Sequence, residues 1–145
     1  MLPYTVVIVD DHAGVRKGLR LLIECDPTLK LIGEATDGAD AIRVVHALRP
    51  DLLLMDIKMP KMSGLEVLQY LRNEKNPVAI ILLSGHDDRL YVEAAKRLGA
   101  TAFVAKMEGS DVLMNAIHAA QRDAVPKLPA AAPIAVVRDV RLLPC

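Results

Sequence analysis

The sequence predicts an α/β fold in which helices cover both faces of a parallel sheet. Between about residues 5 and 123, short apolar runs alternate with longer stretches in which apolar residues recur at helical spacing. This alternation is typical of parallel strands connected by helices. Several of the apolar runs contain almost no polar residue, as expected for strands that are buried on both faces.

Five segments are expected to form strands, and they span residues 6–9, 31–35, 52–55, 79–83 and 102–105. The first, third and fourth of these segments show almost no polar alternation. We therefore expect these three strands at the centre of the sheet.

Five helices are expected between and after the strands, each with one apolar face. The residues that define these faces are Val15, Leu19, Leu22 and Ile23; Ala41, Val44, Val45 and Leu48; Leu65, Leu68 and Leu71; Tyr91, Ala94, Ala95 and Leu98; and Val112, Ile117 and Ala120. The fourth pattern is the weaker one. Pro50 and Gly99 stand where helices should stop.

The composition changes after Asp123, where three prolines within residues 125–133 exclude a continued helix and indicate a stiff linker. We expect one domain over residues 1–123, and a Pro/Ala linker with a short apolar tail over 124–145. The tail is too short for a complete output domain. Its apolar alternation predicts that residues 134–143 lie extended against a sheet edge or groove, with a detached tail as the alternative.

Charge and hydropathy exclude several classes of protein. The chain has 18 basic and 18 acidic residues, so charge alone gives no reason to expect direct contact with nucleic acid. No apolar run approaches the ~20 residues of a membrane span, and no signal peptide is visible. We therefore expect a cytoplasmic protein without membrane contact, in which Cys25 and Cys145 are reduced thiols.

Polar residues follow four of the predicted strands. Asp10 and Asp11 follow the first strand, Asp56 the third, Ser84 the fourth and Lys106 the fifth. The carboxyl ends of parallel strands open onto one crevice, so these side chains should meet there. Clustered carboxylates repel one another unless a cation holds them, and hard oxygen ligands of this kind suit Mg²⁺.

This cluster indicates the chemistry of an aspartyl phosphate. Asp56 would attack phosphorus, a bound Mg²⁺ would neutralise the phosphoryl oxygens, and Lys106 and Ser84 would hold the transferred group. Each of these residues alone has an ordinary structural explanation, such as helix capping for the Asp-Asp pair. Their joint placement at four strand ends favours a functional site.

At these residues the sequence resembles the response-regulator receiver family, over about residues 4–123. The stretches that carry the resemblance are 7–12, 53–66, 82–85 and 99–106. The pattern Asp-x-x-Met-Pro-x-x-x-Gly, which begins at Asp56, is highly specific. Residues 11–19 and 31–38 look most like receivers of NarL/FixJ-type transcription regulators.

The resemblance implies a flavodoxin-like, doubly wound sheet of five parallel strands in the order 2-1-3-4-5, with five helices. It implies that Asp56 is the phosphorylation site and a ligand of Mg²⁺, that Asp11 is a direct ligand, and that Asp10 is a direct or a water-mediated ligand. It also implies that Lys58 contributes its backbone carbonyl to the metal.

The resemblance further implies that Ser84 and Phe103 form a switch. Ser84 replaces the threonine of many members and keeps the hydroxyl. Met107 and Glu108 depart from the family pattern after Lys106, so we expect the loop that enters the last helix to differ in position from that of relatives. Lys58 and His86 occupy positions that tune the lifetime of the phosphoryl group in this family.

By this resemblance the protein is a two-component signalling switch and not an enzyme acting on an external substrate. Its partner would be a sensor histidine kinase or a phosphotransfer protein, and phosphorylation would favour a homodimer. Its output would be transcription control through a missing or separate DNA-binding domain, or alternatively protein contacts of a single-domain regulator.

Two other functions are less well supported. A Mg²⁺-dependent phosphohydrolase needs a second carboxylate two residues after the nucleophile, where this chain has Lys58. A receiver that no longer accepts phosphate is disfavoured because all the expected active-site side chains are present.

Several residues have two interpretations. His12 and His86 could suggest a transition-metal site, although loop roles are favoured. Phe103 fits a core residue or a moving switch equally well. Arg16, Lys17 and Arg20 are expected to form a solvated helix face, in preference to a patch that docks a kinase.

Overall fold

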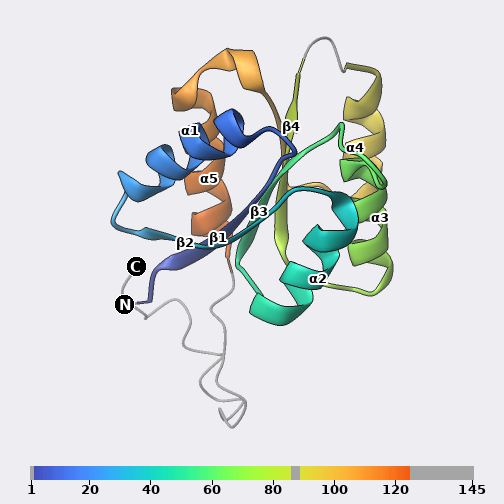
Figure 1. Cartoon of the computed structure of the whole chain (residues 1–145), viewed down its shortest axis with the longest axis horizontal. Helices are drawn as coiled ribbons and strands as arrows, with labels where there is room; N and C mark the ends of the chain where they lie inside the picture. Colours follow the sequence, from blue (N-terminus) through green and yellow to red (C-terminus); the bar gives the residue numbers. More distant parts are fainter. Residues whose placement is uncertain (1, 86–88, 125–145) are drawn as a thin grey trace, which may run out of the picture.

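The computed structural model describes residues 2–85 and 89–124, which form a sheet covered by helices (Figure 1). The strands are β1 (Tyr4–Val9), β2 (Leu29–Ala35), β3 (Leu52–Asp56), β4 (Ala79–Ser84) and β5 (Ala102–Ala105). The helices are α1 (Ala13–Glu24), α2 (Gly38–Leu48), α3 (Gly64–Asn73), α4 (Val92–Leu98) and α5 (Ser110–Asp123). Two 3-10 turns, η1 (Arg89–Tyr91) and η2 (Lys106–Glu108), precede α4 and α5.

The five strands pair in the order β2-β1-β3-β4-β5, and every pairing is parallel. This confirms the predicted fold and the central position of β1, β3 and β4. The residues of β3 are all buried, because helices cover both faces of the sheet. Because all five strands run parallel, their carboxyl ends point to one edge of the molecule, toward the top of Figure 1.

Two helical layers enclose the sheet. Helices α1 and α5 cover one face, and α2, α3 and α4 cover the other (Figure 1). The core of the first face includes Leu19 and Ile23 of α1 with Leu113 and Ile117 of α5. The core of the second face is built mainly by α2 and α3 and includes Ala95 of α4. Each helix thus buries part of the apolar stripe that its sequence period predicts.

The predicted helix stops are confirmed. Helix α2 ends at Arg49, whose left-handed backbone has a φ of 46°, directly before Pro50. Helix α4 ends at Gly99, with a φ of 93°. Glycine adopts this conformation without the steric cost that a Cβ brings.

The predicted face of α5 is wrong at its first residue. Val112 is 38% exposed, and the buried residues of the helix are Leu113, Ile117 and Ala120. Val112 lies five residues before Ile117, and at about 100° per residue this places the two side chains on different sides of the helix. Leu113 lies one turn before Ile117 and takes the position facing the sheet. Similarly, Leu48 of α2 is 44% exposed.

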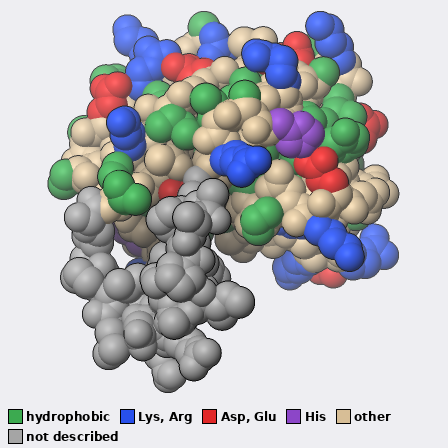
Figure 2. Space-filling view, turned by 90° about the horizontal axis from the view of Figure 1, so that it is seen from below, with side chains coloured by type: hydrophobic (Ala, Val, Ile, Leu, Met, Phe, Trp, Pro, Cys, Tyr) green, Lys and Arg blue, Asp and Glu red, His purple; other side chains and the backbone are tan. Residues whose placement is uncertain are grey.

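Some expectations concern residues outside the described ranges. The docked strand at 134–143, the linker, Cys145 and His86 all lie there. Within the described residues, Cys25 is a free, exposed thiol, and no helix combines the length and apolar character needed to cross a bilayer. Figure 2, seen from below, shows acidic and basic side chains spread among apolar and neutral ones on that face.

Candidate functional site

The polar residues predicted to meet do lie at the carboxyl edge of the sheet. Asp10 directly follows β1, Asp56 and Ser84 are the last residues of β3 and β4, and Lys106 begins η2 directly after β5. Because β1, β3, β4 and β5 are adjacent in that order, their ends bring together residues that are as many as 96 positions apart.

Lys106 joins the two buried carboxylates of the site. Its Nζ donates to Asp10 Oδ2 at 2.9 Å and lies 3.3 Å from Asp56 Oδ2. Asp10 is fully buried and Asp56 is 4% exposed. One ammonium group therefore neutralises part of a charge that two carboxylates carry inside the protein.

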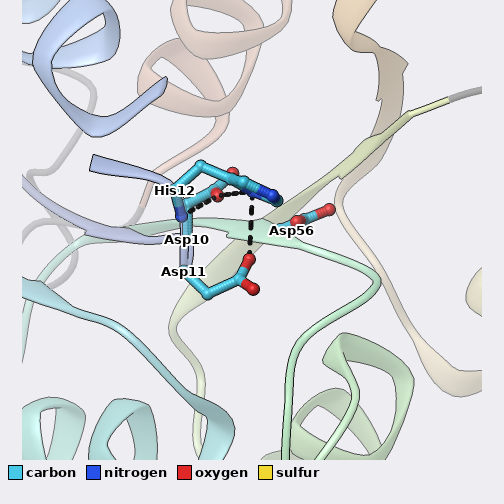
Figure 3. Close-up of side chains that lie close together, drawn as sticks. All are labelled: Asp10, Asp11, His12 and Asp56. Carbon is cyan, nitrogen blue, oxygen red and sulfur yellow. Dashed lines mark hydrogen bonds and ion pairs between the residues drawn. The ribbon is translucent and has the colours of Figure 1, made fainter. Parts of the chain in front are cut away.

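Asp11 and His12 complete a cluster at the end of β1. His12 Nδ1 lies 3.0 Å from Asp10 Oδ1 and 3.1 Å from Asp11 Oδ1. Asp10, Asp11, His12 and Asp56 each place one possible ligand atom within 4.8 Å of the others. Figure 3 shows the three side chains that follow β1 gathered beside Asp56 from β3.

The surroundings of Asp56 disfavour its ionised carboxylate. Burial, and next the negative charge of Asp10, raise the pKa of Asp56 above its ordinary value, although Lys106 acts in the opposite direction. Burial on its own would lower the pKa of Lys106, but the bonds to Asp10 and Asp56 outweigh burial and raise this pKa. The protein alone thus leaves an uncompensated negative charge that a cation would relieve.

The loop after Asp56 is held by backbone hydrogen bonds. Ile57 N–H donates to Leu83 O at 3.1 Å, and Gly64 N–H donates to Ile57 O at 2.8 Å. The N–H of Lys58 donates to Asp56 Oδ1 at 3.4 Å. A Cβ on Gly64 would collide with the carbonyl oxygen of Asp56 and lie 3.0 Å from Ile57 Cα. The glycine of the specific sequence pattern therefore allows α3 to begin directly against the backbone of Asp56.

Ser84 and Phe103 lie on neighbouring strands. Ser84 is 2% exposed, and among the described residues its hydroxyl has no hydrogen-bonding partner. A buried hydroxyl that makes no hydrogen bond within the described part of the chain can donate one to a ligand. Phe103 is partly buried and packs against the core of the face that α2, α3 and α4 cover. Its packing fits the core interpretation, and its movement stays a prediction.

The donor set fits Mg²⁺. Three carboxylates supply hard oxygen atoms, and two of these carboxylates are buried around a single ammonium group. A small divalent cation that keeps several waters needs only a few protein ligands of this kind. The residues that could hold it are Asp10, Asp11 and Asp56, with the backbone carbonyl of Lys58 as the predicted fourth ligand.

An open groove of about 550 Å³ adjoins the cluster. Its lining includes Asp11, Lys58, Met59, Leu65 and Tyr91. The groove runs from Asp11 and Lys58 to Tyr91 of η1 and opens this side of the site to solvent.

Two contacts of the site were missed by sequence reasoning. His12 lies in the loop before α1, as expected, and its ring also contacts both Asp10 and Asp11. The expected solvated face is wrong at Arg16, which is 19% exposed and donates from Nη1 to the carbonyl oxygen of Asp10 at 2.8 Å. Arg16 and Arg20 lie four residues apart in α1, which indicates that they share one face, but only the fold shows which partner each side chain takes.

Residues 6–118 match the response regulator receiver domain. The chain belongs to this family. It is 42% identical over 117 residues to the transcriptional regulatory protein YdfI of Bacillus subtilis, which covers 81% of this receiver and 54% of YdfI. Its fold matches that of the signal receiver domain of NarL from Mycobacterium tuberculosis with a TM-score of 0.77 and 30% identity, covering 83% and 98% of the two chains. The receiver is related to NarL/FixJ-type transcriptional regulators.

A similar sequence also occurs in a relative whose name describes a different activity. The chain is 39% identical over 133 residues to a protein-glutamate methylesterase/protein-glutamine glutaminase of Symbiobacterium thermophilum, covering 90% of this chain and 36% of that protein. The chain spans about half the length of the first curated relatives that it matches. The family membership thus identifies a receiver and leaves its output open.

Proposed function

We propose that this receiver accepts a phosphoryl group on Asp56 from a phosphohistidine donor and uses Mg²⁺ to do so. The observation that carries the proposal is the position of Lys106, whose ammonium group contacts both Asp10 and Asp56 at a buried carboxylate cluster. Such a cluster is expensive to maintain for stability alone. It is therefore better explained by chemistry at Asp56.

Asp10, Asp11, Asp56 and the carbonyl of Lys58 would hold the ion, which supplies positive charge for the phosphoryl oxygens. A carboxylate oxygen of Asp56 forms the new bond to phosphorus while the bond from phosphorus to the donor imidazole nitrogen breaks. The bonding electron pair leaves with the imidazole. Lys106 holds a phosphoryl oxygen as a point charge, which suits an ammonium group.

Ser84 would respond to the added group. Its hydroxyl is buried without a partner among the described residues, so a phosphoryl oxygen on Asp56 can accept a hydrogen bond from it. Movement of Ser84 toward Asp56 would open space into which Phe103 packs further. The surface of α4, β5 and α5 would change as a result.

The partner of the resting form would be a sensor histidine kinase or a phosphotransfer protein in the cytoplasm. The output would be transcription control through a DNA-binding domain that is separate from the described residues, as the relation to transcriptional regulators supports. We expect no direct contact of this receiver with nucleic acid or membrane, and no turnover of an external substrate.

The test is incubation with acetyl phosphate and Mg²⁺, followed by intact mass and by an assay of released phosphate. We expect a gain of one phosphoryl group, its dependence on Mg²⁺, and its loss in the Asp56→Asn variant, whose amide cannot act as the nucleophile. Ser63→Ala, which alters the α3 cap at the other end of the same loop, is the control for general damage.

Three results are distinguishable. A stable gain of mass supports the switch, whereas continuous release of phosphate without accumulation supports a hydrolase. Absence of both supports a receiver that no longer accepts phosphate. Labelling that persists in Asp56→Asn would show that another residue is the acceptor.

Phosphorylation should also favour a homodimer, through α1 and α5 or through α4 and α5. Light scattering of the protein with and without acetyl phosphate measures this directly. A single mass under both conditions would contradict the expectation.

A further inference from the structure

Arg16 fixes the backbone at the metal-binding end of β1. Its Nη1 donates to the carbonyl oxygen of Asp10 at 2.8 Å, and the N–H of Asp10 donates to Ala35 O at 3.1 Å. The peptide groups on both sides of the Asp10 Cα are therefore held, one by α1 and the other by β2. The direction of the Asp10 side chain follows from this backbone, as does the position of Asp11, the next residue.

Arg16 is itself held by Glu34, in β2. The Nε of Arg16 lies 3.4 Å from Glu34 Oε1, and the two side chains are 19% and 26% exposed. Glu34 also accepts hydrogen bonds from Arg20 Nε at 3.1 Å and from Arg20 Nη2 at 2.8 Å. A planar guanidinium can serve the Asp10 carbonyl and the Glu34 carboxylate at once, which an ammonium group cannot do in the same geometry.

Arg16 and Arg20 differ in their contacts with Asp10. Both pair with Glu34, but only Arg16 has a hydrogen bond to Asp10. Arg20 is also more exposed, at 41%. Loss of either arginine removes an ion pair on the same face of α1, while loss of Arg16 alone releases the backbone at the site.

We infer that Arg16 is a positioning residue of the magnesium site: held by Glu34, it fixes the Asp10 carbonyl and so places the carboxylates of Asp10 and Asp11 for the ion. The inference rests on the proposed function, because it needs Mg²⁺ to bind at these carboxylates. Groups that orient metal ligands from outside change metal affinity without touching the metal. Arg16 acts in this way through the backbone.

The experiment is titration of the phosphate-free protein with Mg²⁺, followed by the amide NMR signals of residues 9–12 and, separately, by calorimetry. We expect Arg16→Gln to raise the Kd for Mg²⁺ about tenfold and to shift the amide signals of Asp10 and Asp11 before any metal is added. Arg20→Gln is the matched control and should change the Kd by less than about twofold, with smaller shifts at Asp10. Arg16→Lys keeps one donor for the Asp10 carbonyl and should recover part of the affinity.

Equal Kd values for Arg16→Gln and Arg20→Gln would overturn the inference, as would wild-type affinity in Arg16→Gln. If Arg16→Gln does not fold, the Kd for Mg²⁺ is measured in Arg16→Lys and Glu34→Gln instead. A wild-type Kd in both of these variants would overturn the inference. Failure of the wild-type protein to bind Mg²⁺ would instead count against the proposed function. The two failures are thus separated by the wild-type titration.

Discussion

Lys106 Nζ lies 2.9 Å from Asp10 Oδ2, an ion pair between the ends of two strands that are not neighbours in the sheet. Asp10 is fully buried, so the ammonium group is an important counter-charge for this carboxylate. Removal of one partner of a buried ion pair leaves the other charge without compensation.

Lys106→Ala should therefore destabilise the metal-free protein by about 2 kcal/mol, less than for a fully buried pair because Lys106 is 23% exposed. Added Mg²⁺ should recover much of this loss, since the ion supplies positive charge to the same carboxylates. Urea denaturation at pH 7 with and without Mg²⁺ measures both effects. Lys96→Ala is the control. The exposed ammonium group of Lys96 lies as far as 3.8 Å from Glu93 Oε1, so this substitution should change stability little.

Asp56→Asn should be more stable than the wild type at pH 7 in the absence of Mg²⁺. Burial and the charge of Asp10 raise the pKa of Asp56 in the folded protein, so the folded state binds this proton more tightly than the unfolded state. The stability from this group is fully present below the unfolded pKa and is lost as the pH rises through the folded pKa.

The stabilising effect of Asp56→Asn should therefore shrink as the pH falls through the raised folded pKa of Asp56, and it should vanish below the unfolded pKa of about 3.9. Denaturation midpoints with EDTA at several pH values test this. A variant that is less stable than the wild type at neutral pH would contradict the expected electrostatic conflict.

Gly64→Ala should reduce stability by about 2 kcal/mol or more and slow phosphorylation, because overpacking against the main chain forces the backbone to move. The new Cβ would collide with the Asp56 carbonyl oxygen, and Ile57 Cα would lie only 3.0 Å from it. Gly18→Ala in α1 is the matched control, since a Cβ there meets nothing within 4 Å. That control should stabilise the helix by about 0.5–1 kcal/mol. Equal changes in stability for Gly64→Ala and Gly18→Ala would show that the collision with the Asp56 carbonyl oxygen does not cause the loss of stability.

Asp26→Asn should lower stability by about 1–2 kcal/mol at pH 7. The hydrogen bond with His118, followed by those with Thr28, lowers the pKa of Asp26 to about 2. His118 Nε2, on α5, lies 2.7 Å from Asp26 Oδ2, so this contact ties α5 to the turn before β2.

A lowered pKa contributes stability that is present above the unfolded pKa and is lost as the pH falls through the folded value. The difference between wild type and Asp26→Asn should thus disappear between about pH 4 and 2. Urea denaturation at pH 7 and pH 3 is the measurement, with Glu108→Gln, at an exposed carboxylate, as the control. A difference that is independent of pH would contradict the assignment.

Much of the fold could be predicted from sequence because its signals are local. Apolar runs such as 52–55 identify buried strands, and residues at helical spacing such as Ala41 and Val45 identify the helix faces. The wrong prediction of Val112 as a buried residue has the same local origin, because the adjacent residue Leu113 is also apolar and is the one that faces the sheet. The meeting of Asp10, Asp56 and Lys106 also follows from a general property, because parallel strands end at one edge.

The sequence by itself determined the strands, the helix stops and the set of residues at the carboxyl edge, since each depends on neighbours along the chain. Only the tertiary structure decided that Lys106 contacts Asp10 more closely than Asp56, and that Arg16 turns away from solvent toward the Asp10 carbonyl. These partners are separated by up to 96 positions. Their pairing depends on the packing of α1, β2 and β5 around the site, because a charged side chain takes whichever opposite charge the fold brings within reach.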